Sequence, residues 1–473
     1  MNATVPTSPN IVIIGAGPAG VRAAQTLVEA GLHPIVIDEN RRAGGQIYRQ
    51  PPPGFVRSKK ELYGFEAAKA EALHSSFDQL RPAIDYRPDT LVWNCMPGHP
   101  GQLDLLHAQR HAEQPYSHLI LCTGALDRIM PFPGWTLPGV YTLGAAQVAL
   151  KAQGCVLDGR VVIAGSGPLL YLLAYQYVKA GADVVAVLDT ARFGGKLRAL
   201  PALLRQPVTF AKGLYFMGWL RAKGIPLIDG VEQIAADGKK SIQSLRWTRG
   251  GKTTEIACDA LATGFGLRSE TQLAELAGCR FVFNELNQQW LPQRDDAGRS
   301  SVPGVYLAGD GSGIAGADAA ELSGRAAALA LLQDLGLPAN AAAKAAAEQE
   351  SRRLAQTLRS NLQFRQGLET AFPTAVHWAR DCADDLVICR CEEITAGQLR
   401  RSVQQEGTVE INRLKAMTRV GMGRCQGRMC GAAAAEILAH ATGVSVAEAG
   451  RLRVQAPVKP IPVSAALAAE EQT

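Results

Sequence analysis

A glycine-rich loop between an apolar run and a helical pattern constrains the fold of this chain more than any other feature. Residues 11–20 read IVIIGAGPAG, a helical stretch continues to residue 31, and a second apolar run covers residues 34–37. This order of strand, loop, helix and strand forms a βαβ unit. It predicts an α/β chain that begins with a Rossmann-like dinucleotide-binding fold.

Three glycines in this loop fit the G-x-G-x-x-G pattern of dinucleotide sites. Gly15 permits a tight turn, Gly17 lets the backbone approach a pyrophosphate, and Gly20 allows close packing of the helix on the strand. The diphosphate is expected at the helix N-terminus, beside Pro18 and Ala19, where free N–H groups and the helix dipole favour negative charge. A glycine-rich turn that holds no ligand is the alternative interpretation.

An acidic residue at the end of the second strand supports a nucleotide ligand. Asp38 lies about 20 residues beyond the loop, at the distance expected for the carboxylate that binds the ribose hydroxyls. Glu39 is the adjacent alternative.

A second βαβ unit starts at Arg160 with RVVIAGSGPLL. Gly165 and Gly167 fill the first two glycine positions, but Leu170 occupies the third, where a side chain would push the helix away from the strand. Asp189 ends the next strand, either as a ribose ligand or as a strand cap. The sequence therefore predicts a second Rossmann-like fold, inserted in the first, that is poorly suited to nicotinamide binding.

Length, charge and hydropathy narrow the function classes. A chain of 473 residues is too long for one typical domain. Its net charge of +6 is modest and gives no reason to expect a nucleic-acid partner. The first residues lack the features of a secretion signal, and no run of 18 apolar residues suggests a membrane span. A cytoplasmic protein is expected.

The late cysteines carry the most specific signal. Cys389 and Cys391 form a C-x-C pair, and after 33 residues Cys425 and Cys430 form a C-x4-C pair. Four thiolates in two close pairs can surround two irons. Zinc and a pair of disulfides are the alternatives, although C-x-C is not a usual zinc spacing.

The residues around these cysteines agree with an anionic cluster. The stretch from residue 386 to 453 holds ten Lys and Arg against six Glu. Glycines that free the backbone for N–H donation, and arginines beside the ligands that offset the cluster charge, are Gly421, Gly423, Gly427, Gly431, Arg390, Arg424 and Arg428. For the arginines, ordinary solvated charge is the alternative. Residues 394–403, 409–417 and 431–441 are expected to be short helices.

Cysteines earlier in the chain do not suggest dithiol chemistry. A disulfide reductase needs two closely spaced cysteines beside its flavin, and no such pair precedes Cys382. Cys122 and Cys155 are isolated, and we interpret both as small buried hydrophobes.

Three further segments carry a resemblance to the FAD-dependent pyridine-nucleotide oxidoreductases related to thioredoxin reductase. They are GGQIYR at residues 44–49, a strand that ends in TGA at residues 123–125, and GVYLAGDG at residues 304–311. The resemblance implies FAD in the first fold, with Asp310 on the ribityl chain and the helix start at 311–318 near the flavin. The further FAD-contacting residues that it implies are Gly45, Gln46, Thr123, Gly124, Gly309 and Ala317.

The spacing of the late cysteines resembles the bacterioferritin-associated-ferredoxin-like [2Fe-2S] domain, except that its second pair is C-x2-C. The whole combination resembles the larger flavin subunit of heteromeric dehydrogenases, a group that includes opine oxidase, hydrogen cyanide synthase, and D-hydroxyproline and proline dehydrogenases with their alpha subunits. In these complexes an amino-acid-oxidase-like subunit oxidises a C–N bond, and the subunit that resembles this chain relays the electrons.

The resemblance implies FAD, a [2Fe-2S] cluster and, in some relatives, an FMN between the subunits. It also implies a small third subunit in some complexes, a quinone or carrier as acceptor, and a position in the cytoplasm or at the inner face of the membrane. An exposed apolar face is expected where the partner docks. The alternatives are a stand-alone NAD(P)H-dependent flavin reductase with a ferredoxin-like domain, and a nucleotide-sensing scaffold with structural zinc.

The domain limits follow from these segments. Residues 1–128 and 300–335 are expected to form the FAD-binding domain, with residues 129–299 inserted as the second nucleotide-binding-like domain. Residues 336–383 are a helical connector, residues 384–453 a small, mostly helical [2Fe-2S] domain, and residues 454–473 a proline-containing tail that we expect to be an extended strap.

Overall fold

The first nucleotide fold is a five-stranded parallel sheet built from distant parts of the chain. The computed structural model describes residues 9–52, 54–55, 57–374 and 378–465. In the sheet order the strands are β20 (Val305–Leu307), β7 (His118–Leu121), β1 (Ile11–Ile14), β2 (Ile35–Ile37) and β3 (Asp85–Arg87). Helix α1 (Pro18–Glu29) packs against the long helix α10 (Ala317–Asp334). Strand β20, which lies in the segment predicted to complete this fold, pairs with β7.

The second nucleotide fold repeats the same arrangement between β7 and β20. Its parallel sheet has the order β12 (Leu227–Asp229), β11 (Asp183–Asp189), β10 (Arg160–Ser166), β16 (Ala260–Phe265) and β9 (Val140–Thr142). Helices α4 (Leu143–Ala152), α5 (Pro168–Lys179) and α8 (Pro207–Ala222) pack around it, and α6 (Phe193–Arg198) and α7 (Leu200–Leu203) precede α8. The predicted double Rossmann-like fold is confirmed.

Antiparallel elements surround and join the two folds. Strands β4 (Thr90–Met96), β5 (Gly101–His107) and β6 (Arg110–Tyr116) form one sheet, and β13 (Gln233–Asp237), β14 (Ser244–Arg249) and β15 (Lys252–Ala257) form another. Strands β8 (Ala125–Asp127) and β17 (Leu267–Ser269) pair where the chain crosses between the folds.

The packing supports an earlier end of the inserted domain than residue 299. Helix α9 (Gln272–Leu276) contributes Leu273 and Ala274 to the core that contains β1 and β7. The hairpin of β18 (Phe281–Asn284) and β19 (Gln289–Pro292) follows directly. We propose that the chain returns to the first fold near residue 266, because no later residue joins the second parallel sheet as the structure describes it.

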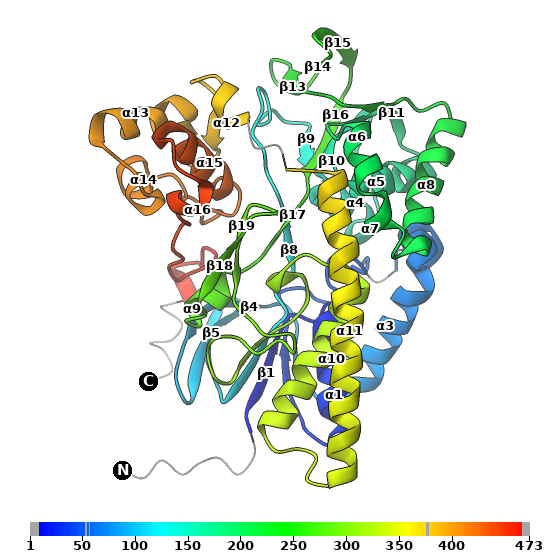
Figure 1. Cartoon of the computed structure of the whole chain (residues 1–473), viewed down its shortest axis with the longest axis vertical. Coiled ribbons are helices and arrows are strands. Elements are labelled where there is room, and N and C mark those ends of the chain that lie inside the picture. The colour runs from blue at the N-terminus through cyan, green and yellow to red at the C-terminus, as the bar shows by residue number, and fades with distance from the viewer. Residues whose placement is uncertain (1–8, 53, 56, 375–377, 466–473) are drawn as a thin grey trace.

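A 31-residue helix, α11 (Ala341–Ala371), forms the connector and packs along α10 (Figure 1). The cluster domain then forms a lobe of its own, at the upper left of Figure 1. It consists of helix α12 (Trp378–Asp381), the hairpin of β21 (Val387–Cys389) and β22 (Ile394–Thr395), and helices α13 (Ala396–Glu406), α14 (Ile411–Thr418), α15 (Gly431–Thr442) and α16 (Val446–Ala449). The three predicted short helices are confirmed.

The tail runs back along the first fold. Val458 is 2% exposed, lies in the core of the first fold, and its N–H donates to the carbonyl of Trp93 at 2.9 Å. The strap that the prolines predicted is therefore seen as far as residue 465, and residues 466–473 lie outside the described part. Cys122 is buried as predicted, whereas Cys155 is exposed. The interpretation of Cys155 as a core residue was wrong, because it follows α4 in a loop.

Candidate functional site

The glycine loop of the first fold is shaped by close backbone contacts. A Cβ on Gly15 would lie 2.4 Å from the carbonyl oxygen of Cys122, and one on Gly20 would lie 1.8 Å from that of Gly15. A side chain at either position would collide with the backbone, so both positions require glycine for the close packing of the loop and α1 on the strands. Gly17 is different: its φ of −78° suits any residue, and a Cβ would lie 3.5 Å from the Cα of Gly45. Its missing side chain therefore keeps space free at the helix start.

Helix α1 begins at this space with Pro18, and Ala19 is buried behind it. No side chain caps the helix, so its first N–H groups are available to an anionic ligand. This cradle fits a diphosphate, as the sequence predicted.

Asp38 lies behind the loop and holds it. Its carboxylate accepts hydrogen bonds from the N–H of Ala16 at 2.5 Å and from the N–H of Asn40 at 2.7 Å. The residue is 6% exposed, and burial raises the pKa of the carboxyl, while these N–H donors oppose the rise. Glu39 is exposed and forms an ion pair with Lys459 of the tail. Contact of Asp38 or Glu39 with a ribose stays a prediction.

The remaining predicted FAD residues come together at the carboxyl ends of the first sheet. The side chain of Gln46 donates to the carbonyl of Ala125 at 2.7 Å, which joins the Gly45 loop to the Thr123–Gly124 loop. Asp310 accepts hydrogen bonds from the N–H groups of Ala315 and Gly316, at 2.8 and 3.0 Å, and so shapes the turn into α10.

Other residues predicted to contact FAD also lie at the carboxyl ends of the first sheet. Gly309 is held by the hydroxyl of Ser323 at 2.8 Å, and Ala317 opens α10, whose start has no side-chain cap. A Cβ on Gly124 would meet nothing within 4 Å, so open space adjoins this loop. A cradle of glycines with two uncapped helix starts fits an elongated diphosphate cofactor such as FAD.

The second fold has the same loop but a different interior. A Cβ on Gly165 would lie 1.8 Å from the carbonyl oxygen of Gly264, and Gly167 has a φ of +114°, so both glycines are required by the turn. Leu170 is fully buried and packs in the core of this fold. The third glycine position thus contributes to packing here.

The carboxylate at the end of β11 is already neutralised. The Nζ of Lys196 lies 2.8 Å from Asp189 and 3.0 Å from Asp229, and the hydroxyl of Tyr171 donates to Asp189 at 2.6 Å. The Asp189 side chain has no exposed surface. Burial raises the pKa of Asp189, and Lys196 opposes the rise. The residue that would bind a ribose is therefore enclosed by its own chain.

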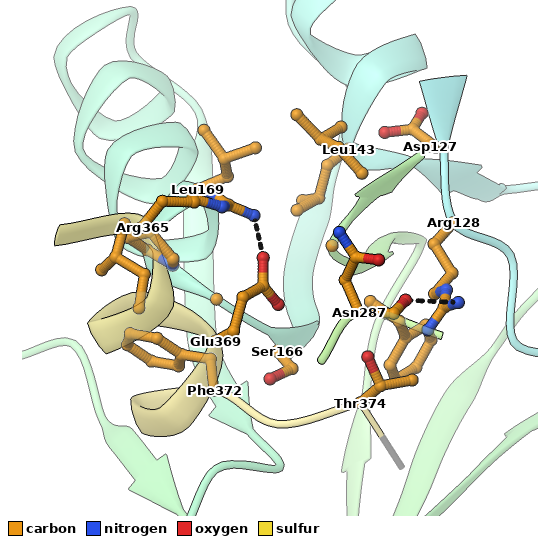
Figure 2. Close-up of a pocket in the computed structure, with 16 residues that line it drawn as sticks. Asp127, Arg128, Leu143, Ser166, Leu169, Asn287, Arg365, Glu369, Phe372 and Thr374 are labelled. Carbon is orange, nitrogen blue, oxygen red and sulfur yellow. Dashed lines mark hydrogen bonds and ion pairs between the residues drawn. The ribbon is translucent and has the colours of Figure 1, made fainter. Parts of the chain in front are cut away.

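The end of α11 lies over the amino end of α5. Figure 2 shows a pocket that Glu369 and Phe372 of this segment line together with Ser166 of the glycine loop and Leu169 of α5. Glu369 is ion-paired with Arg365. This ion pair occupies space beside the amino end of α5.

Arg128 lines the opposite side of the same pocket. It is 5% exposed, and its guanidinium donates to the carbonyls of Asn287 and Gln288 at 3.1 and 2.8 Å. Burial lowers the pKa of this guanidinium. Its contacts tie the crossing segment to the β18–β19 hairpin.

The four late cysteines converge in the cluster domain. Cys389 ends β21, Cys391 follows it, and Cys425 and Cys430 frame the turn that leads into α15. The thiols of Cys389 and Cys430, of Cys425 and Cys430, and of Cys391 and Cys425 lie close enough to shift one another's pKa. Cys389 and Cys430 are each 1% exposed, whereas Cys391 is exposed. The structure therefore brings together the predicted ligand set.

The pKa shifts divide the four thiols into two pairs. The neighbouring Cys430 thiol and the backbone N–H groups of Gly421, Glu392 and Cys391 lower the pKa of Cys389 to about 6. Cys430 and the N–H groups of Met429 and Gly427 similarly lower the pKa of Cys425 to about 5. The pKa of Cys430 is raised by its two thiol neighbours, and burial raises the pKa of Cys391. N–H donation from the glycines to cluster sulfurs stays a prediction.

The spacing of the sulfurs separates two metal possibilities. A tetrahedral zinc needs its four sulfurs about 3.8 Å apart from one another, given a zinc–sulfur bond of about 2.3 Å. Among the described residues, no three of these cysteine sulfurs lie within 4.8 Å of one another. Such an extended set suits two irons better than one zinc.

The arginines near the ligands divide into two kinds. Arg424 is exposed, and the guanidinium of Arg390 lies 5.9 Å from the ring centre of Trp135. Arg428 is paired with a carboxylate: its Nε donates to Glu270 at 2.6 Å, and the two side chains are only 14% and 13% exposed. The prediction that Arg428 offsets the charge of the cluster stays a prediction, because Glu270 already balances the charge of this guanidinium.

This ion pair belongs to a link that sequence patterns did not reveal. The side chain of Gln272 donates to the carbonyl of Gln426, inside the Cys425–Cys430 turn, at 2.9 Å. Glu270 is in turn bonded to the predicted flavin loop, since its carbonyl accepts from Thr123 at 2.5 Å and its N–H donates to Gly124 at 3.0 Å. The flavin loop and the cluster turn are thus connected through three residues.

Known proteins show the same combination of parts. A family model for pyridine nucleotide-disulphide oxidoreductases matches residues 9–324, and one for the BFD-like [2Fe-2S] binding domain matches residues 387–440. An opine oxidase subunit of Rhizobium meliloti is 38% identical over 96% of this chain and 86% of its own length. The hydrogen cyanide synthase subunit HcnB of Pseudomonas aeruginosa is 37% identical over 96% of this chain and 97% of its own length.

Solved structures agree on the fold. L-proline dehydrogenase from P. horikoshii superposes with a TM-score of 0.70 over 97% of this chain and 79% of that chain, at 18% identity. Thioredoxin reductase from T. acidophilum superposes with a TM-score of 0.52 over 69% of this chain and 98% of that chain, at 20% identity. With its two parallel sheets and its four converging cysteines, the chain belongs to the pyridine nucleotide-disulphide oxidoreductase family and carries a BFD-like [2Fe-2S] binding domain, as an oxidoreductase subunit of the opine oxidase and hydrogen cyanide synthase type.

Proposed function

We propose that this chain is the electron-transferring subunit of a heteromeric dehydrogenase that oxidises the C–N bond of an amino acid, imino acid or opine. The contacts of Glu270 and Gln272 carry the proposal, because they fasten the cluster turn directly to the predicted flavin loop. The matching relatives are named as subunits of opine oxidase and of hydrogen cyanide synthase.

FAD on the Gly15–Gly20 loop and a [2Fe-2S] cluster on the four cysteines would supply the redox chemistry, since a flavin can divide a two-electron oxidation into single steps. The chain itself would hold these groups at a fixed separation. The buried Arg428–Glu270 pair and the Val458 strap keep the cluster turn against the first fold.

The second fold has a structural role in this proposal. Leu170 fills the third glycine position, Lys196 neutralises Asp189, and Glu369 faces the amino end of α5. Each of these features disfavours NAD(P)H, which supports an electron-relay subunit over a stand-alone reductase.

A partner subunit similar to an amino-acid oxidase would dock at the cluster end. Exposed apolar side chains lie there on the same domain as the exposed Cys391, namely Val409, Met417 and Met422. Unpaired apolar surface of this kind marks interaction sites. A small third subunit, and a quinone or a protein carrier as acceptor, complete the proposed assembly in the cytoplasm or at the inner face of the membrane.

An FMN between the subunits has a suitable place beside the cluster domain. A pocket between this domain and the body is lined by the Nε of Arg268, the Oγ of Ser269 and the Nε1 of Trp290, none of which has a hydrogen-bond partner among the described residues. Arg453 and Lys415 also line it. Such donors would suit the phosphate and hydroxyl groups of a flavin mononucleotide.

Steady-state assays with an artificial acceptor test the proposed function. The isolated chain should show a negligible rate with NADH, NADPH or amino acids, and the co-expressed complex should oxidise an opine, an imino acid or glycine. Rapid NADPH oxidation by the isolated chain would promote the reductase function instead.

A further inference from the structure

Large apolar side chains are exposed along one outer edge of the second fold. They belong to α6, the end of α7 and α8, which we name the α6–α8 surface (residues 193–222). Its most exposed apolar members are Phe193 at 71%, Leu197 at 60%, Leu204 at 54%, Val208 at 69%, Leu214 at 54% and Tyr215 at 46%. Proteins rarely leave such a group of side chains in water.

Helix α8 explains why this surface is apolar. Its inner side buries Phe216 and Leu220 in the core of the second fold. Its outer side presents Val208 and Tyr215 instead of the polar residues that a water-exposed helix face normally carries. The helix is therefore apolar on both sides, and the outer side needs a covering.

The charges on the surface have one sign. Between Asp189 and Asp229 the chain has seven Lys and Arg and no acidic residue. Three of these cations, Arg192, Lys196 and Lys212, form ion pairs with carboxylates of neighbouring elements. The other four are Arg198, Arg205, Arg221 and Lys223, and no carboxylate lies within 4.0 Å of them in the described part of the chain. They remain available to an anionic partner.

We propose that the α6–α8 surface docks on an anionic lipid membrane. Apolar and aromatic side chains among Lys and Arg are the composition of segments that lie in the membrane interface. No helix among the described residues is long and apolar enough to cross a membrane, so this docking would be peripheral.

The position of the surface favours lipid over the electron-donating subunit. In Figure 1, α6 and α8 lie on the side of the molecule opposite to the cluster domain. A subunit that delivers electrons must approach the cofactors, and so it should bind elsewhere. Membrane docking through α6–α8 leaves the cluster end free, and it does not depend on the proposed substrate or partner.

Vesicle sedimentation tests the proposal with the full chain and with the co-expressed complex. Both should pellet with phosphatidylcholine vesicles that contain phosphatidylglycerol, bind pure phosphatidylcholine vesicles far less, and be released as salt screens the charges. Removing charge in Arg198→Gln and Arg205→Gln should weaken binding about fivefold for each arginine. The double variant Phe193→Ser with Val208→Ser removes apolar contact with the lipid. It tests the apolar contribution to binding separately from the charges.

The controls are matched substitutions on the other side of the molecule. Val282→Ser replaces a valine that is 50% exposed, and Arg413→Gln removes an exposed arginine of the cluster domain. Both should leave vesicle binding unchanged. Three results would overturn the proposal: no binding of the wild type to anionic vesicles at low salt, α6–α8 variants that bind like the wild type, or a complex that cannot bind because another subunit or a second copy covers this surface.

Discussion

The two glycine-loop folds each place the loop after the central strand of a five-stranded parallel sheet, but one keeps a free cradle and the other has closed it. In the first fold, Gly20 occupies the third glycine position, close to the backbone of Gly15. The carboxylate of Asp38 accepts a hydrogen bond from Ala16 and so fixes the glycine loop. In the second fold, Leu170 takes the equivalent position and Asp189 is enclosed by Lys196. A βαβ unit with a glycine loop is therefore a scaffold, and the residues packed around the loop decide whether it binds anything.

The two folds also differ in their neighbours. The first fold is bonded through Glu270 to the cluster turn, whereas the end of α11 lies over the loop of the second. One fold thus faces a redox partner within the chain, and the other faces a structural helix. Four experiments can break or sharpen this contrast.

The largest effect is expected from Gly17→Val in the first fold. Its φ of −78° accepts a side chain without backbone strain, so the valine should extend into the space for the diphosphate and abolish flavin retention. The flavin-to-protein ratio from absorbance measures this effect, with circular dichroism as a check on folding. Gly167→Ala changes the corresponding glycine of the second fold; it strains that turn, because Gly167 has a φ of +114°, but it should leave the flavin bound. Full flavin occupancy in Gly17→Val would remove the distinction between the folds.

The cluster turn that is bonded to the first fold can be tested with Cys425→Ser. Loss of one ligand should eliminate the EPR signal of the dithionite-reduced protein and most of its iron and acid-labile sulfide. Cys382→Ser is the control, because this thiol accepts from Arg400 at 3.1 Å and lies outside the ligand set. Stoichiometric zinc without iron in the wild type would contradict the assignment.

In the second fold, Lys196→Met should be destabilising. It leaves Asp189 buried without its counter-ion, which should lower the free energy of unfolding by about 3 kcal/mol. Urea denaturation measures the change, and Lys240→Met, at an exposed position, is the control. The flavin should stay bound in both variants. Flavin loss in Lys196→Met would show that the two folds are not independent.

The smallest effect concerns Lys151, which joins α4 of the second fold to the carbonyl of Ile47 in the first at 3.0 Å. Burial lowers the pKa of Lys151 from 10.5 to about 8. Between these pH values the unfolded chain binds more protons than the folded one, so stability should rise with pH, by about 2 kcal/mol from pH 8 to pH 10.

Lys151→Met should remove this rise. Urea unfolding at both pH values compares the two proteins, and an equal slope in the variant would show that another group causes it.

Local patterns in the sequence were sufficient for a large part of this architecture. The βαβ units, a helix in the connector of residues 336–383 and the three short helices of the cluster domain are all present, the connector helix as α11 and the short helices near α13, α14 and α15. The four cysteines predicted as ligands also come from one domain of the structure. Each of these features depends on residues close together in the chain, whose periodicity or spacing is visible without knowledge of the fold.

The tertiary structure decided what long-range packing controls. Glu270 forms an ion pair with Arg428, which is 158 positions away in the sequence. Lys196 pairs with both Asp189 and Asp229 only because β11 and β12 are neighbours in one sheet. No spacing in the sequence marks these partners, since their distance depends on how sheets and helices pack. The sequence by itself thus determined where the cofactor motifs lie, and the packing decided which glycine loop stays open and how it is joined to the cluster.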